Sequence, residues 1–274
     1  MITITIPVVN GFHLREVLSS ISSQTYTDYE VIVINDSRNK TVPILIKEYG
    51  GQELISNGSS LKARYLGANS AKGEYILQLD ETRIIKDNTL LENLMEINAD
   101  AIFINETEEG KSFLSRAAGI DKSLLITTEN VKSGSPSVLP RFYRTDILRK
   151  SMEILKKNLG EDFDKITAPE DLLIFTEAKN FIKSTYLLNS SKISHYGDDS
   201  LKKVVIKYYK YGKDFSKLQA TKYSKLVKGN GIERLRSRIR NINSYNDILM
   251  VSFLFFIRGI STQLGKMKGK HEKR

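Results

Sequence analysis

A regular alternation of strand-like and helix-like segments over the first 105 residues is the feature that most constrains the fold. Residues 2–9 alternate with a period of two and residues 30–34 form a second apolar run, so both predict strands. Between them, residues 12–22 carry apolar side chains at helical spacing, which completes a β-α-β unit. Strands that alternate with helices form mostly parallel sheets with right-handed crossovers. The sequence therefore predicts an α/β fold in which a mostly parallel sheet is flanked by helices.

The same pattern continues along the chain. Further strands are expected at residues 53–56, 75–79 and 101–105, further helices at 43–49, 61–71, 88–97 and 169–179, and a strand followed by a helix at 141–155. From residue 111 to residue 140 the pattern weakens, and a Gly-Ser-Pro-Ser stretch at 134–137 predicts a mobile loop. The first residues alternate in polarity instead of forming one apolar block, so we expect a strand there and not a signal peptide.

Charge divides the chain into two unequal parts. Residues 200–274 contain 19 Lys/Arg and 4 Asp/Glu, whereas residues 1–199 contain 23 and 28. We therefore expect a mildly acidic α/β domain at residues 1–197 and a basic helical region at residues 198–274. A basic region attracts nucleic acid, an anionic membrane surface or an acidic protein through the same long-range field, so charge alone does not choose among them. The chain has no cysteine, which excludes disulfides, thiolate metal sites and cysteine nucleophiles.

The basic region contains two helix-forming segments. Residues 201–211 mix lysines with apolar and tyrosine side chains, a composition typical of an amphipathic helix at a membrane surface. Residues 248–257 are apolar except for Ser252, but about ten residues are too few for a bilayer span of roughly 20. We expect this segment to lie in the membrane interface, with the last basic residues facing anionic headgroups: Lys266, Lys268, Lys270, Lys273 and Arg274. The alternative is a helical hairpin that packs on the α/β domain or on a second subunit.

Several short motifs resemble family 2 glycosyltransferases of the GT-A fold, in both order and spacing. In the first half, the matching segments are residues 4–10, 18–26 and 29–37, followed by Ala63-Arg64 and by residues 71–80, which lead into the metal-binding D-x-D of that family. Residues 141–144 and 169–171 resemble its acceptor-side segments. The resemblance spans residues 2–197 and implies an inverting enzyme that uses a nucleoside-diphosphate sugar.

The resemblance also implies a divalent metal cofactor, because a carboxylate that ends a buried strand, as Asp80 does, suits Mg²⁺ or Mn²⁺ bridging a diphosphate. This chain reads Asp80-Glu81-Thr82 where the family prefers a second Asp at the third position. Either Glu81 or the Thr82 hydroxyl then helps to hold the metal, or metal binding is weak. His195 matches a histidine that completes the metal or diphosphate site in some relatives, with a structural hydrogen bond as the alternative. The metal candidates are thus Asp80, Thr82 and His195.

Asp171 is the general base that the resemblance implies for the acceptor hydroxyl, with Glu170 beside it, and a pKa raised by partial burial would help its role. The alternative is an ordinary acidic first turn of a helix. Asp36 follows the second predicted strand, where it accepts hydrogen bonds from the nucleotide unless it forms an Asx turn. The full set of expected substrate contacts is Pro7, Asn10, Asp36, Arg64, Asp80, Arg141 and Arg144. For each arginine the alternative is a solvated surface position.

The leading hypothesis is an inverting, metal-dependent glycosyltransferase that acts on a lipid-linked or surface-glycan acceptor, peripherally at the cytoplasmic face of the cell membrane. A catalytically weakened relative that binds nucleotide sugar is the alternative within the same fold. A nucleic-acid-binding protein is the alternative from another class, but an acidic α/β domain and an apolar run in the tail argue against nucleic acid. Self-association into a homo-oligomer stays open.

Overall fold

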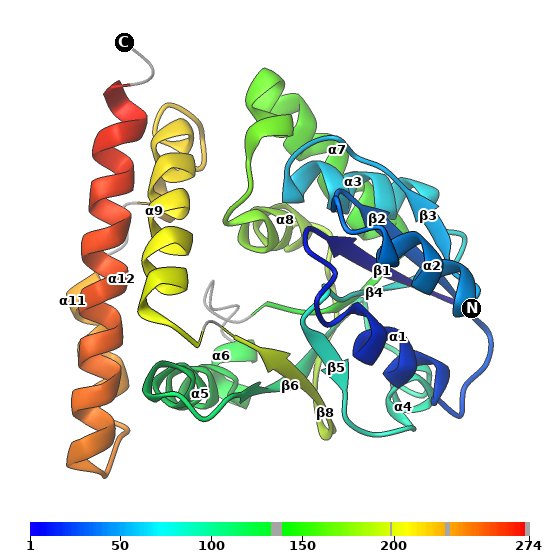
Figure 1. Cartoon of the computed structure of the whole chain (residues 1–274), viewed down its shortest axis with the longest axis horizontal. Helices are drawn as coiled ribbons and strands as arrows, with labels where there is room; N and C mark the ends of the chain where they lie inside the picture. Colours follow the sequence, from blue (N-terminus) through cyan, green and yellow to red (C-terminus); the bar gives the residue numbers. More distant parts are fainter. Residues whose placement is uncertain (133–138, 198, 228–230, 272–274) are drawn as a thin grey trace.

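The computed structural model describes residues 1–132, 139–197, 199–227 and 231–271, so the predicted loop at 134–137 and the basic residues Lys273 and Arg274 lie outside the described residues. The expected α/β fold is confirmed (Figure 1). In the described part of the chain, eight strands form one sheet in the order β3-β2-β1-β4-β7-β6-β8-β5. Helices cover both faces of this sheet, and a separate pair of long helices stands at one side of it.

The first half of the sheet is parallel, as the alternation predicts. It contains β1 (Ile2–Val8), β2 (Tyr29–Asn35), β3 (Gln52–Leu54) and β4 (Tyr75–Gln78), joined by α1 (Leu14–Ser22), α2 (Thr41–Glu48) and α3 (Ser60–Ser70). Val8 lies opposite Asn35, and Thr5 lies opposite Gln78, so β1, β2 and β4 end at the same edge. This register brings the loops that carry Asn10, Asp36 and Asp80 together, as expected from the strand ends.

The second half of the sheet mixes strand directions. β7 (Phe142–Arg144) is antiparallel to both β4 and β6 (Ala101–Glu109), whereas β8 (Thr185–Tyr196) is parallel to β6 and antiparallel to β5 (Arg83–Ile85). The sheet is therefore mixed across its full width. Sequence patterns did not predict β5 or β8, because β5 has three residues and half of β8 is exposed and polar. β6 was expected to end at residue 105, but it continues through four further residues of which three are acidic.

The remaining helices of the α/β domain are α4 (Leu90–Met95), α5 (Phe113–Leu125), α6 (Thr128–Lys132), α7 (Thr145–Leu159) and α8 (Glu170–Ala178), with a 3₁₀ helix at Gly160–Lys165. α5 lies where the sequence pattern weakens, so its existence corrects that expectation. The Ser112 side chain caps α5 by accepting a 3.0 Å hydrogen bond from the Ser115 backbone N–H, which stabilises the first turn. Leu114 and Ala117 form its buried face.

Two apolar cores fill the spaces between the sheet and its helices. One core joins β1, β2 and β4 to α1, α2 and α4, and the other joins the opposite face to α3, α7 and α8. Burial of these branched apolar side chains is the main favourable contribution to folding, at about 25 cal/mol per Å² of apolar surface removed from water. The two cores fix the sheet edge on which the candidate site lies.

The tail folds into α9 (Leu201–Leu218), α10 (Ser224–Val227), α11 (Gly231–Ile239) and α12 (Tyr245–His271). The predicted helix at residues 201–211 is confirmed but is longer than expected. The apolar run at 248–257 is one part of a 27-residue helix that continues through Arg258-Gly259. By length and composition, α12 could cross a membrane, and it is the one such helix among the described residues, although 28% of its most apolar window is buried inside the protein.

The tail is attached to the α/β domain by apolar packing and by hydrogen bonds. Leu218, Tyr223 and Val227 belong to the core that also contains α7 and α8. Asp214 of α9 accepts hydrogen bonds from the backbone N–H groups of Thr167 (2.8 Å) and Ala168 (3.1 Å), just before α8. α12 packs along α9 and also contacts α5 (Figure 1). One side of the helix pair therefore packs on the α/β domain, as the alternative of a packed helical hairpin proposes.

Candidate active site

The candidate site lies at the edge where β1, β2 and β4 end, and it begins with a short loop after β1. Glu81 accepts hydrogen bonds from the backbone N–H groups of Val9 and Asn10, each at 3.1 Å, and from that of Gly11. Gly11 has φ +77°, and a Cβ there would meet Val42, so the loop requires glycine at this position. Glu81 therefore supports the loop after β1, and its carboxylate is engaged there.

Asp36 organises a second loop at the same edge. Its Oδ1 accepts hydrogen bonds from the backbone N–H groups of Ser56 and Asn57, both at 2.9 Å, and its Oδ2 accepts one from the Ser56 hydroxyl. The Asx turn belongs to Asn35 instead, whose Oδ1 accepts from the Ser37 N–H at 3.0 Å. Asp36 thus holds the segment between β3 and α3 against the end of β2, beside the expected nucleotide position.

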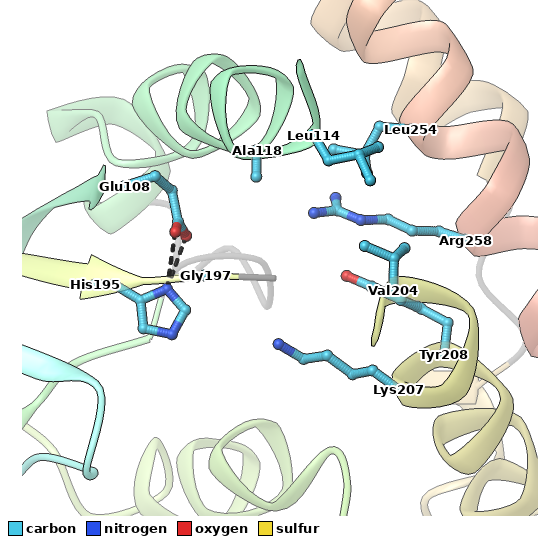
Figure 2. A pocket seen from close by; sticks show the side chains of 10 residues that line it. All are labelled: Glu108, Leu114, Ala118, His195, Gly197, Val204, Lys207, Tyr208, Leu254 and Arg258. Carbon is cyan, nitrogen blue, oxygen red and sulfur yellow. Dashed lines mark hydrogen bonds and ion pairs between the residues drawn. The ribbon is translucent and has the colours of Figure 1, made fainter. Parts of the chain in front are cut away.

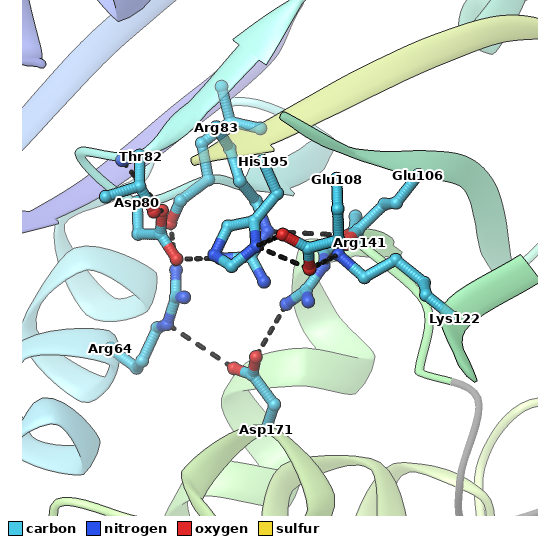
Figure 3. A network of polar contacts seen from close by, with 11 residues as sticks. Arg64, Asp80, Thr82, Arg83, Glu106, Glu108, Lys122, Arg141, Asp171 and His195 are labelled. Atoms are coloured by element: carbon cyan, nitrogen blue, oxygen red, sulfur yellow. Dashed lines mark hydrogen bonds and ion pairs between the residues drawn. The ribbon is translucent and has the colours of Figure 1, made fainter. Parts of the chain in front are cut away.

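A network of buried charges forms the centre of the site (Figure 3). Arg141, just before β7, donates from Nε to Glu106 and from Nη1 to Asp171, each over 2.6 Å. Arg64 of α3 also contacts Asp171, with 3.6 Å between Arg64 Nε and Asp171 Oδ1. The Nη1 of Arg64 donates a hydrogen bond to the Leu79 carbonyl. Residues from α3, β6, α8 and the segment just before β7 therefore meet around the carboxylates of Glu106 and Asp171.

The network continues on its other side through β6 and β8. His195 Nδ1 lies 2.9 Å from Glu108 Oε1, and Lys122 of α5 bridges Glu108 (2.8 Å) and Glu106 (3.1 Å). Burial raises the pKa of Glu108, but His195 and Lys122 outweigh that effect and lower the pKa to about 2. Burial and the nearby charge of Arg83 lower the pKa of His195 to about 4, so its imidazole is neutral at pH 7. The structural hydrogen bond considered for His195 is present.

The groups expected to bind a metal are engaged with other partners. Asp80 Oδ1 accepts hydrogen bonds from the N–H (2.9 Å) and the hydroxyl (2.6 Å) of Thr82, and Asp80 Oδ2 forms an ion pair with Arg83. His195 uses Nδ1 for Glu108, and Glu81 is bound to the loop after β1. In the parts of the chain that the structure describes, three or more carboxylate or imidazole groups do not converge on one point as metal ligands. The donor set Asp80, Thr82 and His195 therefore does not fit a divalent cation, in contrast to the sequence-based expectation.

The two acidic residues at the start of α8 differ in their electrostatic surroundings. Burial raises the pKa of Asp171, but Arg141 and Arg64 outweigh burial and hold that pKa well below its ordinary value. Burial and the adjacent charge of Asp171 raise the pKa of Glu170 to about 7. The expectation that burial would raise the pKa of the base thus applies to Glu170 and not to Asp171. Asp171 Oδ1 is buried and has no hydrogen-bond partner among the described residues.

The other expected substrate contacts divide into two groups. Pro7 on β1 and Asn10 after it lie at the edge of the site, and Arg64 and Arg141 lie within the network. Arg144 does not join them, because it lies opposite Tyr75 at the start of β4 and pairs with Asp146 at 3.1 Å. The solvated surface alternative therefore describes Arg144, whereas Arg64 and Arg141 are both buried.

A cavity of about 40 Å³ separates the network from the tail helices (Figure 2). Glu108 and His195 line it on one side, and Lys207, Tyr208 and Arg258 of α9 and α12 line it on the other. A volume of this size holds about one water molecule, so the cavity itself does not accommodate a sugar. It shows that the tail closes one side of the site.

Sequence reasoning missed four charged members of the network: Arg83, Glu106, Glu108 and Lys122. The sequence contained a weak signal for Glu106, Glu108 and Arg83. Glu106 and Glu108 are two residues apart in an extended segment, so their side chains share one face, and Arg83 follows directly after Asp80-Glu81-Thr82. A lysine on α5 could not be placed, because α5 itself was not predicted.

Comparison with known proteins shows which domain the first part of the chain resembles. The family model Glycosyl transferase family 2 matches residues 3–104. Glycosyltransferase GlyG from Streptococcus pneumoniae is 27% identical over 135 residues, which make up 44% of this chain and 45% of that protein. An uncharacterized glycosyltransferase from Rickettsia typhi is 33% identical over 103 residues, 36% of this chain and 32% of that protein. The chain thus spans less than half the length of these two curated relatives.

Solved structures extend the comparison over the whole chain. The crystal structure of residues 1–349 of S. aureus TarS matches with a TM-score of 0.52 and 16% identity, covering 99% of this chain and 91% of that chain. The same TarS fragment in complex with UDP-GlcNAc matches with a TM-score of 0.51 and 15% identity, with the same coverage. These similarities show that the fold is shared, including the expected GT-A arrangement of the first half.

Proposed function

We propose that the chain transfers a sugar from a nucleoside-diphosphate sugar to an acceptor hydroxyl, with inversion at the anomeric carbon, because residues 3–104 match the family model Glycosyl transferase family 2 and curated relatives are named glycosyltransferases. One observation carries this proposal. The buried carboxylate of Asp171, whose Oδ1 accepts no hydrogen bond in the described residues, lies beside Arg64 and Arg141 at the sheet edge where the loops after β1, β2 and β4 meet. Open α/β sheets bind ligands at this edge.

The nucleotide is proposed to lie against the loops that Glu81 and Asp36 organise. Asn10 lies next to the first loop, and Ser56 and Asn57 form part of the second. A uridine nucleotide is the first choice, because the TarS fragment that shares this fold has been crystallised with UDP and with UDP-GlcNAc. The sugar and the diphosphate would then extend toward the charged network.

Asp171 is the proposed general base. Its lowered pKa keeps the carboxylate ionised, and Oδ1, which accepts no hydrogen bond in the described residues, is the proposed acceptor of the hydroxyl proton. Arg64 and Arg141 fix its orientation, which favours attack from one direction. Glu170, with a pKa near 7, is the alternative base on the same helix turn.

The acceptor is proposed to be lipid-linked or part of a surface glycan, reached from the cytoplasmic face of the cell membrane. The support is a row of exposed apolar side chains along α12: Leu249, Phe253, Phe256, Ile260, Leu264 and Met267. Of these, Phe253 also contacts the ring of Phe113 on α5. Lys268 and Lys270 are exposed at its end. Apolar side chains next to lysines are typical of helices that lie in an anionic membrane interface.

The test of the donor class is a thermal-stability screen of the full chain with UDP-, GDP- and dTDP-sugars. A ligand that binds the folded state at 100 times its Kd stabilises by about 2.7 kcal/mol, which raises the Tm by roughly 5–10 °C. One nucleotide class should produce this shift, and the wild-type protein should then transfer the sugar or hydrolyse the donor slowly. A Tm shift without transfer or hydrolysis would favour the catalytically weakened relative. No shift with any donor would contradict the proposed function.

A further inference from the structure

Arg83 occupies the position beside Asp80 at which a metal ion would be needed. Its side chain is 10% exposed, and β5 holds it opposite His195 of β8 in the antiparallel register. The guanidinium forms an ion pair with Asp80 Oδ2 and lies 3.4 Å from Glu106 Oε1 through its Nε (Figure 3). Asp80, whose position at a strand end favours binding of the donor diphosphate, is therefore already neutralised by a residue of this chain.

A metal ion that bound Asp80 would have to displace this guanidinium. Glu106 could not neutralise the displaced charge alone, because it already accepts from Arg141 at 2.6 Å and from Lys122 at 3.1 Å. Leaving a buried arginine without a full partner is costly, since its charge is removed from water without compensation. The contacts of Arg83 therefore oppose metal binding at Asp80.

The network is balanced without a metal. In the described residues that Figure 3 labels, the carboxylates of Asp80, Glu106, Glu108 and Asp171 face the cations of Arg64, Arg83, Arg141 and Lys122. A diphosphate brings additional negative charge, so it needs a cation that can reorient toward it. Asp80 is the most exposed of the four carboxylates, at 26%, and Arg83 is its ion-pair partner. A guanidinium also offers several N–H donors in the planar arrangement that matches phosphate oxygens.

We propose that Arg83 supplies, in place of a divalent metal, the positive charge that the donor diphosphate requires. This inference rests on the proposed function. In the transfer step, the acceptor oxygen forms a bond to the anomeric carbon while the bond from that carbon to the diphosphate oxygen breaks. The electron pair of the broken bond stays on the diphosphate, and the hydroxyl proton goes to Asp171. Arg83 donates hydrogen bonds to the departing oxygens and keeps its own protons.

The experiment is a calorimetric titration of the full chain with UDP, GDP and dTDP, each in the presence of EDTA and in the presence of Mn²⁺. The wild-type protein should bind one of them with the same affinity, within threefold, in both conditions. Arg83→Gln should weaken that affinity at least tenfold in EDTA, and Arg83→Lys should weaken it less because the charge is kept. Arg15→Gln is the matched control, since Arg15 also pairs with a carboxylate, Glu48 at 2.8 Å, but lies on the surface of α1. It should bind like the wild type.

The outcomes separate this inference from the proposed function. Nucleotide binding that occurs with Mn²⁺ and is lost in EDTA would overturn the role of Arg83 and leave the proposed function intact. Thr82→Asp adds the carboxylate that the D-x-D pattern expects, and a tenfold gain in affinity from Mn²⁺ in this variant, with Arg83 present, would overturn it as well. If no nucleotide binds in either condition, both the function and the role of Arg83 are contradicted. Circular dichroism shows whether Arg83→Gln folds. If it does not, the role of Arg83 is tested by two other measurements: the nucleotide affinity of the wild type in EDTA and in Mn²⁺, and the nucleotide affinity of Arg83→Lys.

Discussion

The imidazole of His195 is largely buried and lies beside the guanidinium of Arg83, so the protein favours its neutral form. The pKa of His195 falls from its ordinary value of 6.5 to about 4 in the folded state. A group whose pKa is lowered on folding contributes stability that is complete above the unfolded pKa and is lost as the pH falls through the folded pKa. The stability contributed by His195 is therefore lost between pH 6.5 and pH 4.

We predict that the wild-type protein loses up to about 3 kcal/mol of unfolding free energy between pH 6.5 and pH 4 because of His195. His195→Asn cannot acquire the charge, so its unfolding free energy should fall less over the same range. Urea unfolding followed by circular dichroism at several pH values measures the difference. Parallel pH profiles for the two proteins would show that His195 is not held neutral.

The two acidic residues that begin α8 can be separated by pH. Asp171→Asn should leave donor affinity within about threefold and lower kcat by a factor of about 10² to 10⁴, because a base acts only in the transition state. Since the pKa of Asp171 is held low, kcat of the wild type and of Glu170→Gln should stay level as the pH falls from 8 to 6. A wild-type rate that falls below pH 7 and a Glu170→Gln variant without activity would assign the base role to Glu170 instead.

The contact between α9 and α12 depends on small residues where the two backbones approach each other. A Cβ at Gly265 would lie 2.0 Å from the carbonyl oxygen of Tyr209, and one at Gly212 would lie 2.1 Å from that of Thr262. Neither oxygen can move without shifting a helix backbone. Gly259 lies on the same helix as Gly265, but a Cβ there would meet no atom within 4 Å.

We predict opposite effects for two alanine substitutions in α12. Gly265→Ala should destabilise the protein by about 1–3 kcal/mol through overpacking, whereas Gly259→Ala should stabilise it by up to about 1 kcal/mol through helix propensity. Thermal unfolding of both variants provides the comparison. Equal Tm values would mean that α9 and α12 are not in close contact.

The molecule as a whole has an α/β domain at one side and the helix pair at the other (Figure 1), and α12 carries a row of exposed apolar side chains. Truncation after Ser244 would remove α12 and uncover the faces of α9 and α5 that pack on it. Loss of membrane binding in such a truncated protein could then reflect misfolding. Substitutions on the exposed face of α12 keep these contacts and so test membrane binding more directly.

We predict that Phe256→Ser combined with Leu264→Ser lowers binding to anionic liposomes by about 100-fold or more, since each apolar side chain contributes about 1.5–3 kcal/mol when it is buried. Phe256 is 62% exposed, so folding should tolerate its loss. Ile44→Ser on α2, at a position that is 64% exposed, is the control and should bind liposomes like the wild type. If the wild type forms dimers that the double variant abolishes, and liposomes are not bound, this face serves a second copy of the chain instead.

Local sequence patterns were sufficient for the parallel half of the sheet and for its ligand-binding edge. Strand periodicity and the residues after each strand placed Asn10, Asp36 and Asp80 correctly, because polarity patterns and strand ends are properties of short segments. The motifs resembling family 2 glycosyltransferases added Arg64, Arg141 and Asp171, which the structure brings into one network. The charge of residues 200–274 likewise follows from the sequence alone.

Only the tertiary structure decided how the charged groups are paired. Arg83 meets Asp80 and Glu106, and Lys122 meets Glu108, because β5, β6, β8 and α5 converge from distant parts of the chain. Arg141 and Arg64 lower the pKa of Asp171, which burial was expected to raise, whereas the pKa of the adjacent Glu170 is raised to about 7. The groups expected to bind metal are engaged with other partners. The strength of an ion pair depends on burial and on distances of a few ångströms, which sequence spacing does not specify for residues on separate elements. The same reason explains why the sequence indicated an apolar segment in the tail, while the structure determined which of its faces is buried against α9 and α5.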